Sequence, residues 1–357
     1  MNPRAWVKMA SKFEQLKNLV EAKIGHFPVS DRRVIVACSG GVDSTALFWV
    51  FLELFQAKKI FSLRLFHFNF GLRGDESDGD EAFCRGLAEG AGIPFELACA
   101  SPEDRESRSG EGIQEWARRL RREALLKVTE RAEWIVLAHH ADDAAETSLM
   151  RIMRGASLAN IRGMDEWSEA GHPPDQRKFF RPWLAVPKED IVAAAAERSM
   201  LFREDTSNAK LDYARNVIRH RVLPELLRLW PAGREKLADL ACDGAELSGY
   251  ALAHAIAETA CQSSAKEMKC SRQKLCALPD SIALAVLAHM VQRASSGSPR
   301  QLSRANLRRC LESARSPAEV ADGLDPADSG KKFTLEMSRG IFLEVRGDTV
   351  RSFPGPA

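Results

Sequence analysis

The chain of 357 residues lacks paired cysteines. It contains eight cysteines, and none of them forms a C-x-x-C pair. A zinc ribbon, an iron–sulfur cluster or a redox dithiol therefore has no support in the sequence. Scattered single cysteines are typical of proteins that work in a reducing cytosol.

Long apolar segments are also missing. Charged residues interrupt the N-terminal stretch MNPRAWVKMASKFEQLKNLV every few positions, so it lacks the apolar region of a signal peptide. No later segment reaches the run of about eighteen apolar residues that a membrane-spanning helix needs. We therefore expect a cytoplasmic protein with no membrane partner.

The chain has no large excess of either charge. Its 51 basic and 49 acidic residues leave a formal net charge of +2. Bulk charge therefore indicates no particular partner, and any surface for nucleic acid must come from local clusters. The length allows two or three domains.

Apolar runs that are typical of buried strands alternate with segments of helical periodicity. Such alternation indicates parallel βαβ units. We expect a Rossmann-like α/β domain with a parallel sheet and helices on both faces, followed by a smaller helical or α+β module. The expected strands are Val34–Ala37, Ser62–Asn69, Ile93–Leu97 and Trp134–Ala138, and the expected helices are Thr45–Phe55, Glu76–Gly90, Ile113–Arg131 and Lys188–Ser199.

Changes in composition divide the chain into three parts. These are an N-terminal helix (residues 1–29), the α/β domain (30–225) and a C-terminal module (226–357). The module should be helical to about residue 293 and rich in strands near 331–353. The polar segment Asp165–Arg177 contains two adjacent prolines and is expected to form a loop.

The segment CSGGVDS follows the first expected strand and contains no lysine, unlike the common G-x-x-x-x-G-K-[ST] phosphate loop. Gly40 and Gly41 allow backbone N–H groups to converge on an anion, and Ser39 and Ser44 add hydroxyl donors. A carboxylate at Asp43 repels phosphate unless Mg²⁺ lies between them. The segment predicts a phosphate site, although a simple helix cap is the structural alternative.

A second polar cluster, HHADDAAE, begins where the fourth expected strand ends. It should share an edge of the sheet with the first loop. Asp142 and Glu146 lie four residues apart, and Asp143 and Glu146 three apart, so either pair shares a helix face. The cluster indicates a metal-facing or acid–base group. A metal-dependent hydrolase or an acidic, solvated first turn remains possible.

Arginines gather in three segments of the otherwise neutral chain. Each cluster alone is as well explained by a solvated helix face, but three together favour a polyanionic partner. Arg118 or Arg121 could equally serve a triphosphate. His67 lies at the end of the second expected strand. It either borders a cleft formed by the two polar segments above or is simply half-buried in the sheet. The later basic and polar candidates are Arg154, Arg203, Asn208, Arg215, Asn216 and Arg219.

These motifs together resemble a known family. SGGVDS is similar to the signature of the PP-loop ATP pyrophosphatases, which cleave ATP to AMP and pyrophosphate. Within that superfamily the chain resembles the tRNA(Ile)-lysidine synthetases over most of residues 30–225. The matching segments are GIQEWARRLRR, LAHHADDAAETSLMRIMRG, RPWLAVPKEDI and FREDTSNAKLDYARNVIRHRVLP.

The resemblance implies a ligase that joins free L-lysine to the wobble cytidine of the CAU-anticodon isoleucine tRNA. ATP would adenylate O2 of the cytidine, the lysine amine would attack C2, and AMP would leave. Asp142 is then expected nearer the Mg²⁺ and Glu146 nearer the lysine.

The resemblance also assigns roles to individual residues. The implied catalytic residues are Asp43, Asp142, Asp143, Glu146 and Arg118, with Asp43 and Asp142 as metal ligands. The implied ATP contacts are Ala37, Ser39, Gly40, Gly41, Val42, Asp43, Ser44, His67 and Arg121. The implied tRNA contacts are Arg154, Arg203, Arg215, Asn216 and Arg219, and the C-terminal module is implied to bind tRNA.

Two positions depart from the family pattern. Phe70 stands where the family usually has histidine, and Arg122 where it usually has tyrosine. The alternatives are a thiolase of the same superfamily, which usually carries paired cysteines, and a non-catalytic relative that binds tRNA or nucleotide. The sequence leaves the oligomeric state open, with a homodimer as one option.

Overall fold

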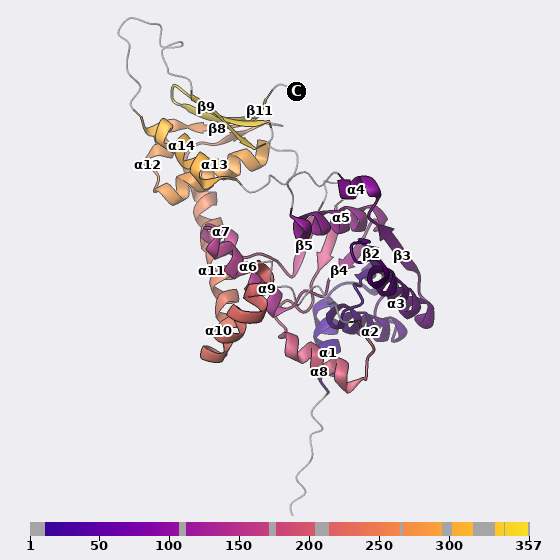
Figure 1. Cartoon of the computed structure of the whole chain (residues 1–357). Helices are drawn as coiled ribbons and strands as arrows, with labels where there is room; N and C mark the ends of the chain where they lie inside the picture. The colour runs from indigo at the N-terminus through magenta and orange to yellow at the C-terminus, as the bar shows by residue number, and fades with distance from the viewer. Residues whose placement is uncertain are drawn as a thin grey trace, which may run out of the picture. The chain divides into compact units, whose positions relative to one another are not determined.

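The structure is a computed structural model that describes residues 11–106, 112–170, 176–203, 214–264, 267–294, 302–316, 333–338 and 340–355. It divides into two compact units, Met1–Cys242 and Asp243–Ala357 (Figure 1). The sequence placed the start of the C-terminal module at residue 226, and the division in the structure falls later, inside helix α11 (Gly233–Glu258). Each unit is described by itself.

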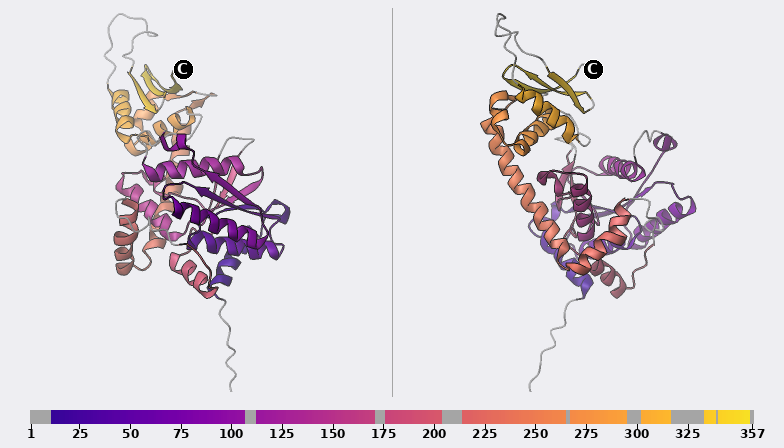
Figure 2. Two further views of the ribbon diagram at one scale, coloured as in Figure 1. Left: turned by 45° about the vertical axis from the view of Figure 1, so that its right-hand side comes forward. Right: turned by 60° about the vertical axis from the view of Figure 1, so that its left-hand side comes forward.

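The first unit contains a six-stranded sheet with the order β3-β2-β1-β4-β6-β5. Helices of the same unit surround this sheet (Figures 1 and 2). All neighbouring strands are parallel except β5, which runs antiparallel to β6. This confirms the expected Rossmann-like α/β class. The strands are β1 (Arg33–Ala37), β2 (Ser62–Asn69), β3 (Phe95–Cys99), β4 (Glu133–Val136), β5 (Trp167–Ala170) and β6 (Arg177–Phe180).

Helices cover both faces of this sheet because neighbouring residues of β1 point to opposite sides. Val34 and Val36 pack in one core with helices α1, α2, α3 and α8. Ile35 packs in a second core with Trp116 and Leu120 of α5. The helices of this unit are α1 (Lys12–Ile24), α2 (Val42–Gln56), α3 (Asp75–Ala91), α4 (Pro102–Glu106), α5 (Ile113–Val128), α6 (Ala141–Met153), α7 (Leu158–Ile161), α8 (Lys188–Glu197), α9 (Ala214–Val217) and α10 (Leu223–Leu229), with a short 3-10 turn at Val29–Asp31 and a π-helical turn at Ile218–Val222.

Two local expectations need revision. The N-terminal helix, set apart in the sequence, packs into the first core through Phe13, Leu16, Val20 and Ile24. The segment 165–177, expected as a loop, contains strand β5 and the start of β6. Its residues 171–175, which include the two prolines, lie outside the described residues. The aromatic stack of Trp167 on Phe180, with ring centroids 4.0 Å apart, stabilises this strand pair.

The second unit contains a five-stranded antiparallel sheet with the order β7-β8-β11-β10-β9. The expected strands near the C-terminus are present, and β10 and β11 meet at Gly347, whose φ of 55° suits the turn. Strands β7 and β8 interrupt a segment expected to be helical. The elements are the part of α11 (Gly233–Glu258) from Asp243 onward, β7 (Gln262–Ser263), β8 (Met268–Ser271), α12 (Arg272–Ala277), α13 (Asp280–Ala294), α14 (Arg304–Arg315), β9 (Phe333–Ser338), β10 (Ile341–Arg346) and β11 (Thr349–Pro354).

Among the described residues, no helix is both long and apolar enough to span a membrane.

Candidate active site

A cavity of about 410 Å³ lies at the carboxyl edge of the parallel sheet. Ligands of open α/β sheets bind at this edge, because loops and helix N-termini meet there. A larger cavity of about 620 Å³ lies elsewhere, between α1, α2 and α3 and the end of α8, and its lining is mostly apolar. The polar cavity therefore is the candidate site. It is lined among others by Ala37, Ser39, Gly41, Asp43, Ser44, His67, Arg121, His139, Asp143, Arg203 and Arg219.

Internal hydrogen bonds and one glycine fix the shape of the loop after β1. Gly40 has a φ of 87°, a conformation that a side chain makes costly. The Ser39 N–H donates to Ser44 Oγ at 3.1 Å, and that hydroxyl donates to the Gly41 carbonyl at 3.0 Å. Helix α2 begins at Val42 directly after the loop, so its N-terminal amides face the cavity edge. This arrangement suits an anion.

Asp43, in the first turn of α2, has one unsatisfied oxygen. Its Oδ1 is buried and has no hydrogen-bond partner among the described residues. Its Oδ2 lies 3.7 Å from both His140 Nε2 and Lys188 Nζ. A buried, unpaired carboxylate oxygen beside an anion cradle fits Mg²⁺, which is commonly held by one or two carboxylates and substrate phosphates. No group of three His, Cys, Asp or Glu side chains suited to a metal occurs in the described parts of the chain.

His67 supports the loop from β2. Its Nδ1 lies 2.9 Å from the carbonyl oxygen of Cys38, and burial lowers the pKa of the imidazole despite the opposing effect of that hydrogen bond. A neutral ring whose Nδ1 donates to this carbonyl fixes the start of the loop. The structure thus gives His67 a clear contact with the loop backbone.

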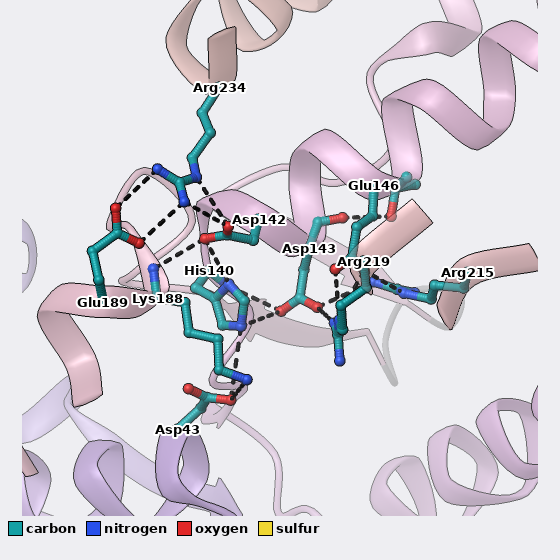
Figure 3. Close-up of polar contacts among 11 residues, drawn as sticks. Asp43, His140, Asp142, Asp143, Glu146, Lys188, Glu189, Arg215, Arg219 and Arg234 are labelled. Carbon is teal, nitrogen blue, oxygen red and sulfur yellow. Dashed lines mark hydrogen bonds and ion pairs between the residues drawn. The ribbon is translucent and has the colours of Figure 1, made fainter. Parts of the chain in front are cut away.

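Asp142 is fully engaged by neighbouring groups (Figure 3). Arg234 Nε donates to Oδ1 at 2.9 Å, and the Lys188 backbone N–H donates to Oδ2 at 3.0 Å. Arg234 also donates to both carboxylate oxygens of Glu189, at 3.0 and 3.1 Å. Burial alone would raise the pKa of Asp142, but His140, the Lys188 amide and Arg234 outweigh it and hold that pKa below its usual range.

Asp143 and Glu146 form a carboxylate pair on one face of α6, as their spacing indicated. Arg219 donates from Nε to Glu146 Oε1 at 2.6 Å and from Nη2 to Asp143 Oδ1 at 2.7 Å. Arg215 donates from Nε to Glu146 Oε2 at 2.8 Å (Figure 3). The Glu146 side chain is fully buried. Both carboxylates are therefore neutralised by arginines from α9 and the turn after it.

The residues expected to contact tRNA lie in different surroundings. Arg215 and Arg219 face the carboxylate pair, and Asn216 is buried. Arg203 lies against the phosphate loop, with its N–H donating to the Gly40 carbonyl at 2.9 Å and its guanidinium paired with Asp80. Arg154 caps the end of α6 and is exposed. Asn208 and the rest of the Asp-Thr-Ser-Asn segment lie outside the described residues.

Arg118 and Arg121 of α5 extend toward this region without a carboxylate partner among the described residues. Arg118 is exposed and Arg121 half-buried at the cavity. Desolvation, followed by repulsion from Arg215 and Arg151, lowers the pKa of Arg118. Desolvation and repulsion from Arg118 and Arg215 likewise lower the pKa of Arg121. A set of mutually repelling guanidinium groups attracts an anion.

Three residues of the site were not predicted, and His140 was predicted only as part of the HHADDAAE cluster. His140 lies among Asp43, Asp142 and Asp143, and Lys188 approaches Asp43. The position of Lys188 at the start of α8, directly after Pro187, was the available sequence signal. Glu189 and Arg234 gave no comparable signal, because their contacts join segments far apart in the chain.

Comparison with known proteins is consistent with this geometry. A family model described as PP-loop domain matches residues 8–226. The tRNA(Ile)-lysidine synthase of Geobacter sulfurreducens is 36% identical over 219 residues, covering 61% of this chain and 45% of the relative. That of Parabacteroides distasonis is 38% identical over 213 residues, covering 58% and 45%. These matches confirm the resemblance seen in the motifs. The chain spans about half the length of the curated relatives it matches.

A solved structure, the U34-tRNA thiolase NcsA from Methanococcus maripaludis with its [4Fe-4S] cluster, has a TM-score of 0.54 at 18% identity. The match covers 66% of this chain and 80% of that one, and it shows a shared fold. The family match covers more than half of the chain and includes the lysine-free loop and the parallel sheet. The chain belongs to the PP-loop family.

Proposed function

We propose that the protein ligates L-lysine to C2 of the wobble cytidine in the CAU-anticodon isoleucine tRNA, through an adenylated cytidine. The observation that carries this proposal is one cavity lined by both the anion loop and Asp143, which forms a carboxylate pair with the buried Glu146. Its relatives named tRNA(Ile)-lysidine synthase align over this part of the chain. Membership of the PP-loop family implies the use of ATP.

In the first step, O2 of the cytidine attacks the α-phosphorus of ATP and pyrophosphate leaves. Negative charge gathers on the leaving group, so preorganised donors stabilise the transition state. The amides after Gly40 and the hydroxyl of Ser39 are the donors that this chain offers, because the Ser44 hydroxyl already donates to the Gly41 carbonyl. Arg121 would face the polyphosphate from α5. Asp43 would hold a Mg²⁺, which neutralises phosphate charge when bound.

We assign Asp142 a supporting role rather than the metal contact expected from the sequence. Both of its oxygens already accept hydrogen bonds, from Arg234 and from the Lys188 amide. Asp43, in contrast, has one oxygen that no described residue hydrogen-bonds. This favours Asp43 alone as the protein carboxylate nearest the phosphates.

In the second step, the ε-amine of lysine attacks C2 and AMP leaves with the original O2 oxygen. The lysine arrives as an ammonium ion and must lose a proton before it attacks. Asp143 and Glu146 are suited to bind that cation and to accept the proton. Their position on α6, next to the loop that holds ATP, would bring the amine toward the activated base.

The RNA would approach over the arginines that have no carboxylate partner in the described chain. Arg118 and Arg154 are exposed candidates for phosphate contacts. We propose that Asp243–Ala357 contributes to tRNA binding. The target base would leave its stack to reach the phosphate loop, as is usual when chemistry occurs on a base.

The test uses the full chain with ATP, Mg²⁺, radiolabelled lysine and a CAU-anticodon tRNA. We expect label in the tRNA and AMP release that requires the tRNA. A tRNA whose anticodon begins with another base is the matched control and should stay unlabelled. Tight binding of ATP and tRNA without any lysine transfer would contradict the proposal and favour a binding-only relative.

A further inference from the structure

The carboxylate pair, Asp143 and Glu146, is occupied by cations from the same chain. Arg215 and Arg219, here called the arginine pair, donate five hydrogen bonds of 2.6–3.2 Å to these two side chains. The Glu146 side chain is fully buried, and the arginine side chains are only 27% and 23% exposed. The contact is therefore closely packed and largely hidden from solvent.

This contact has a consequence for any amine substrate. Two carboxylates balanced by two guanidinium groups leave no net negative charge to attract an ammonium ion. Arginine also binds carboxylates through two parallel N–H groups, which a lysine ammonium cannot match in geometry. An incoming amine would thus have to replace a stronger partner.

We propose that the arginine pair sets the order of substrate binding: it fills the amine subsite until RNA phosphates withdraw it, so that the amine binds after the RNA. This inference rests on the proposed function, because it takes the carboxylate pair as the amine subsite. Phosphate groups suit the arginine pair as well as carboxylates do.

The backbone that carries the arginine pair is suited to such a movement. Arg215 lies in α9, which has only four residues, and Arg219 lies in the π-helical turn Ile218–Val222. Short helices and π-helical turns are less regular than a long α-helix, and π-helical turns often occur at functional sites. A small change in this segment would move both guanidinium groups together.

Once a polyanion is present, neighbouring positive charges favour a position of the arginine pair away from the carboxylate pair. Repulsion from Arg215 contributes to the lowered pKa of both Arg118 and Arg121. These arginines thus share one positive field, which a phosphate backbone would neutralise. The same RNA that delivers the cytidine would then open the subsite for the amine that attacks it.

The experiment measures binding of radiolabelled lysine, and of n-butylammonium as a plain amine, to the full chain by equilibrium dialysis. Wild type should bind both amines weakly without RNA. In the presence of the CAU tRNA its affinity for each amine should be at least about 10-fold higher. The double variant Arg215→Gln, Arg219→Gln should bind both amines tightly without RNA. The variant Arg215→Lys, Arg219→Lys keeps the cations but loses the paired N–H groups, so its amine affinity without RNA should lie between those of wild type and the Gln double variant.

Arg228→Gln is the matched control, because Arg228 is exposed and, among the described residues, pairs with Glu225 of its own helix alone. Amine binding by the Gln double variant that is no tighter than wild type would overturn the inference. If that variant does not fold, an amine affinity of wild type that stays constant as tRNA is added would overturn it instead. Failure of lysine transfer alone would count against the proposed function, and the n-butylammonium results would still decide on the arginine pair.

Discussion

At the scale of single residues, the site contains two carboxylates in opposite circumstances. Asp43 Oδ1 is buried and has no hydrogen-bond partner in the described part of the chain, whereas both oxygens of Asp142 accept hydrogen bonds. An unsatisfied polar atom costs stability and usually has a functional reason. Removal of the Asp43 carboxylate should therefore lower activity more than stability. Disruption of the contacts of Asp142 should lower stability more than activity.

The variant Asp43→Asn should lower tRNA-dependent AMP release by at least about 100-fold, because it removes the charge that would hold Mg²⁺. Its melting temperature should stay equal to that of wild type or rise, since the lost carboxylate oxygen had no partner. Calorimetry and an AMP assay measure the two effects. A variant that is strongly destabilised but still active would contradict this role.

Arg234→Met should lower the free energy of unfolding by about 1–3 kcal/mol, because a half-buried carboxylate loses a charged donor. Chemical denaturation measures the change. Glu189→Gln is the matched control, since Glu189 shares Arg234 but is 61% exposed. That control should change stability by less than about 1 kcal/mol. Equal losses in the two variants would show that Asp142 is not the important partner.

The same contact predicts a pH dependence. The pKa of Asp142 is depressed in the folded protein, so its ionised form favours folding. That contribution is complete above the pKa of an unfolded aspartate, about 3.9, and disappears as the pH falls through the lower folded value. The stability difference between wild type and Arg234→Met should be constant from pH 7 to about pH 5 and shrink below pH 4. A difference that grows on acidification would contradict the assignment.

At the scale of secondary structure, local patterns predicted the elements that form the site. The strand, the loop and the helix around Gly40 follow from an apolar run, two glycines and a second apolar run. The contacts of Arg215 and Arg219 with α6 could not be predicted, because about seventy residues separate them. Their sequence indicated only positive charge, and charge alone does not distinguish a phosphate partner from a carboxylate. Strand β5 was missed because two prolines follow it closely.

Gly40→Ala tests the loop as an element. At a φ of 87° a side chain costs about 1–2 kcal/mol, and the added Cβ would lie 3.5 Å from the Phe83 ring. We expect lower stability and weaker ATP binding, measured by denaturation and titration calorimetry. Gly41→Ala is the control, since Gly41 has a φ of −69° that any residue adopts. A larger effect at Gly41 than at Gly40 would contradict the account of the loop backbone.

At the scale of the whole molecule, the proposed chemistry lies in Met1–Cys242, and the family match ends at residue 226. Asp243–Ala357 has a hydrophobic core of its own, which includes Leu275, Val286 and Leu343. A change in this unit should therefore be able to weaken the proposed tRNA binding without changing ATP binding.

Leu343→Ala should destabilise the second unit by about 2–5 kcal/mol, since Leu343 is fully buried in its core. We expect a weaker affinity for tRNA and an unchanged affinity for ATP, each measured by direct titration. Leu335→Ala, at a partly buried position of β9, is a milder control. An equal loss of both affinities would show that the two units do not act separately.

Mass spectrometry of the anticodon nucleoside, after reaction with ATP, Mg²⁺, lysine and the CAU tRNA, is the decisive test of the proposed ligation. We expect a cytidine that has gained lysine and lost one water, in an amount equal to the AMP released. A cytidine that is unchanged, or that has gained sulfur when a sulfur donor is present, would contradict it.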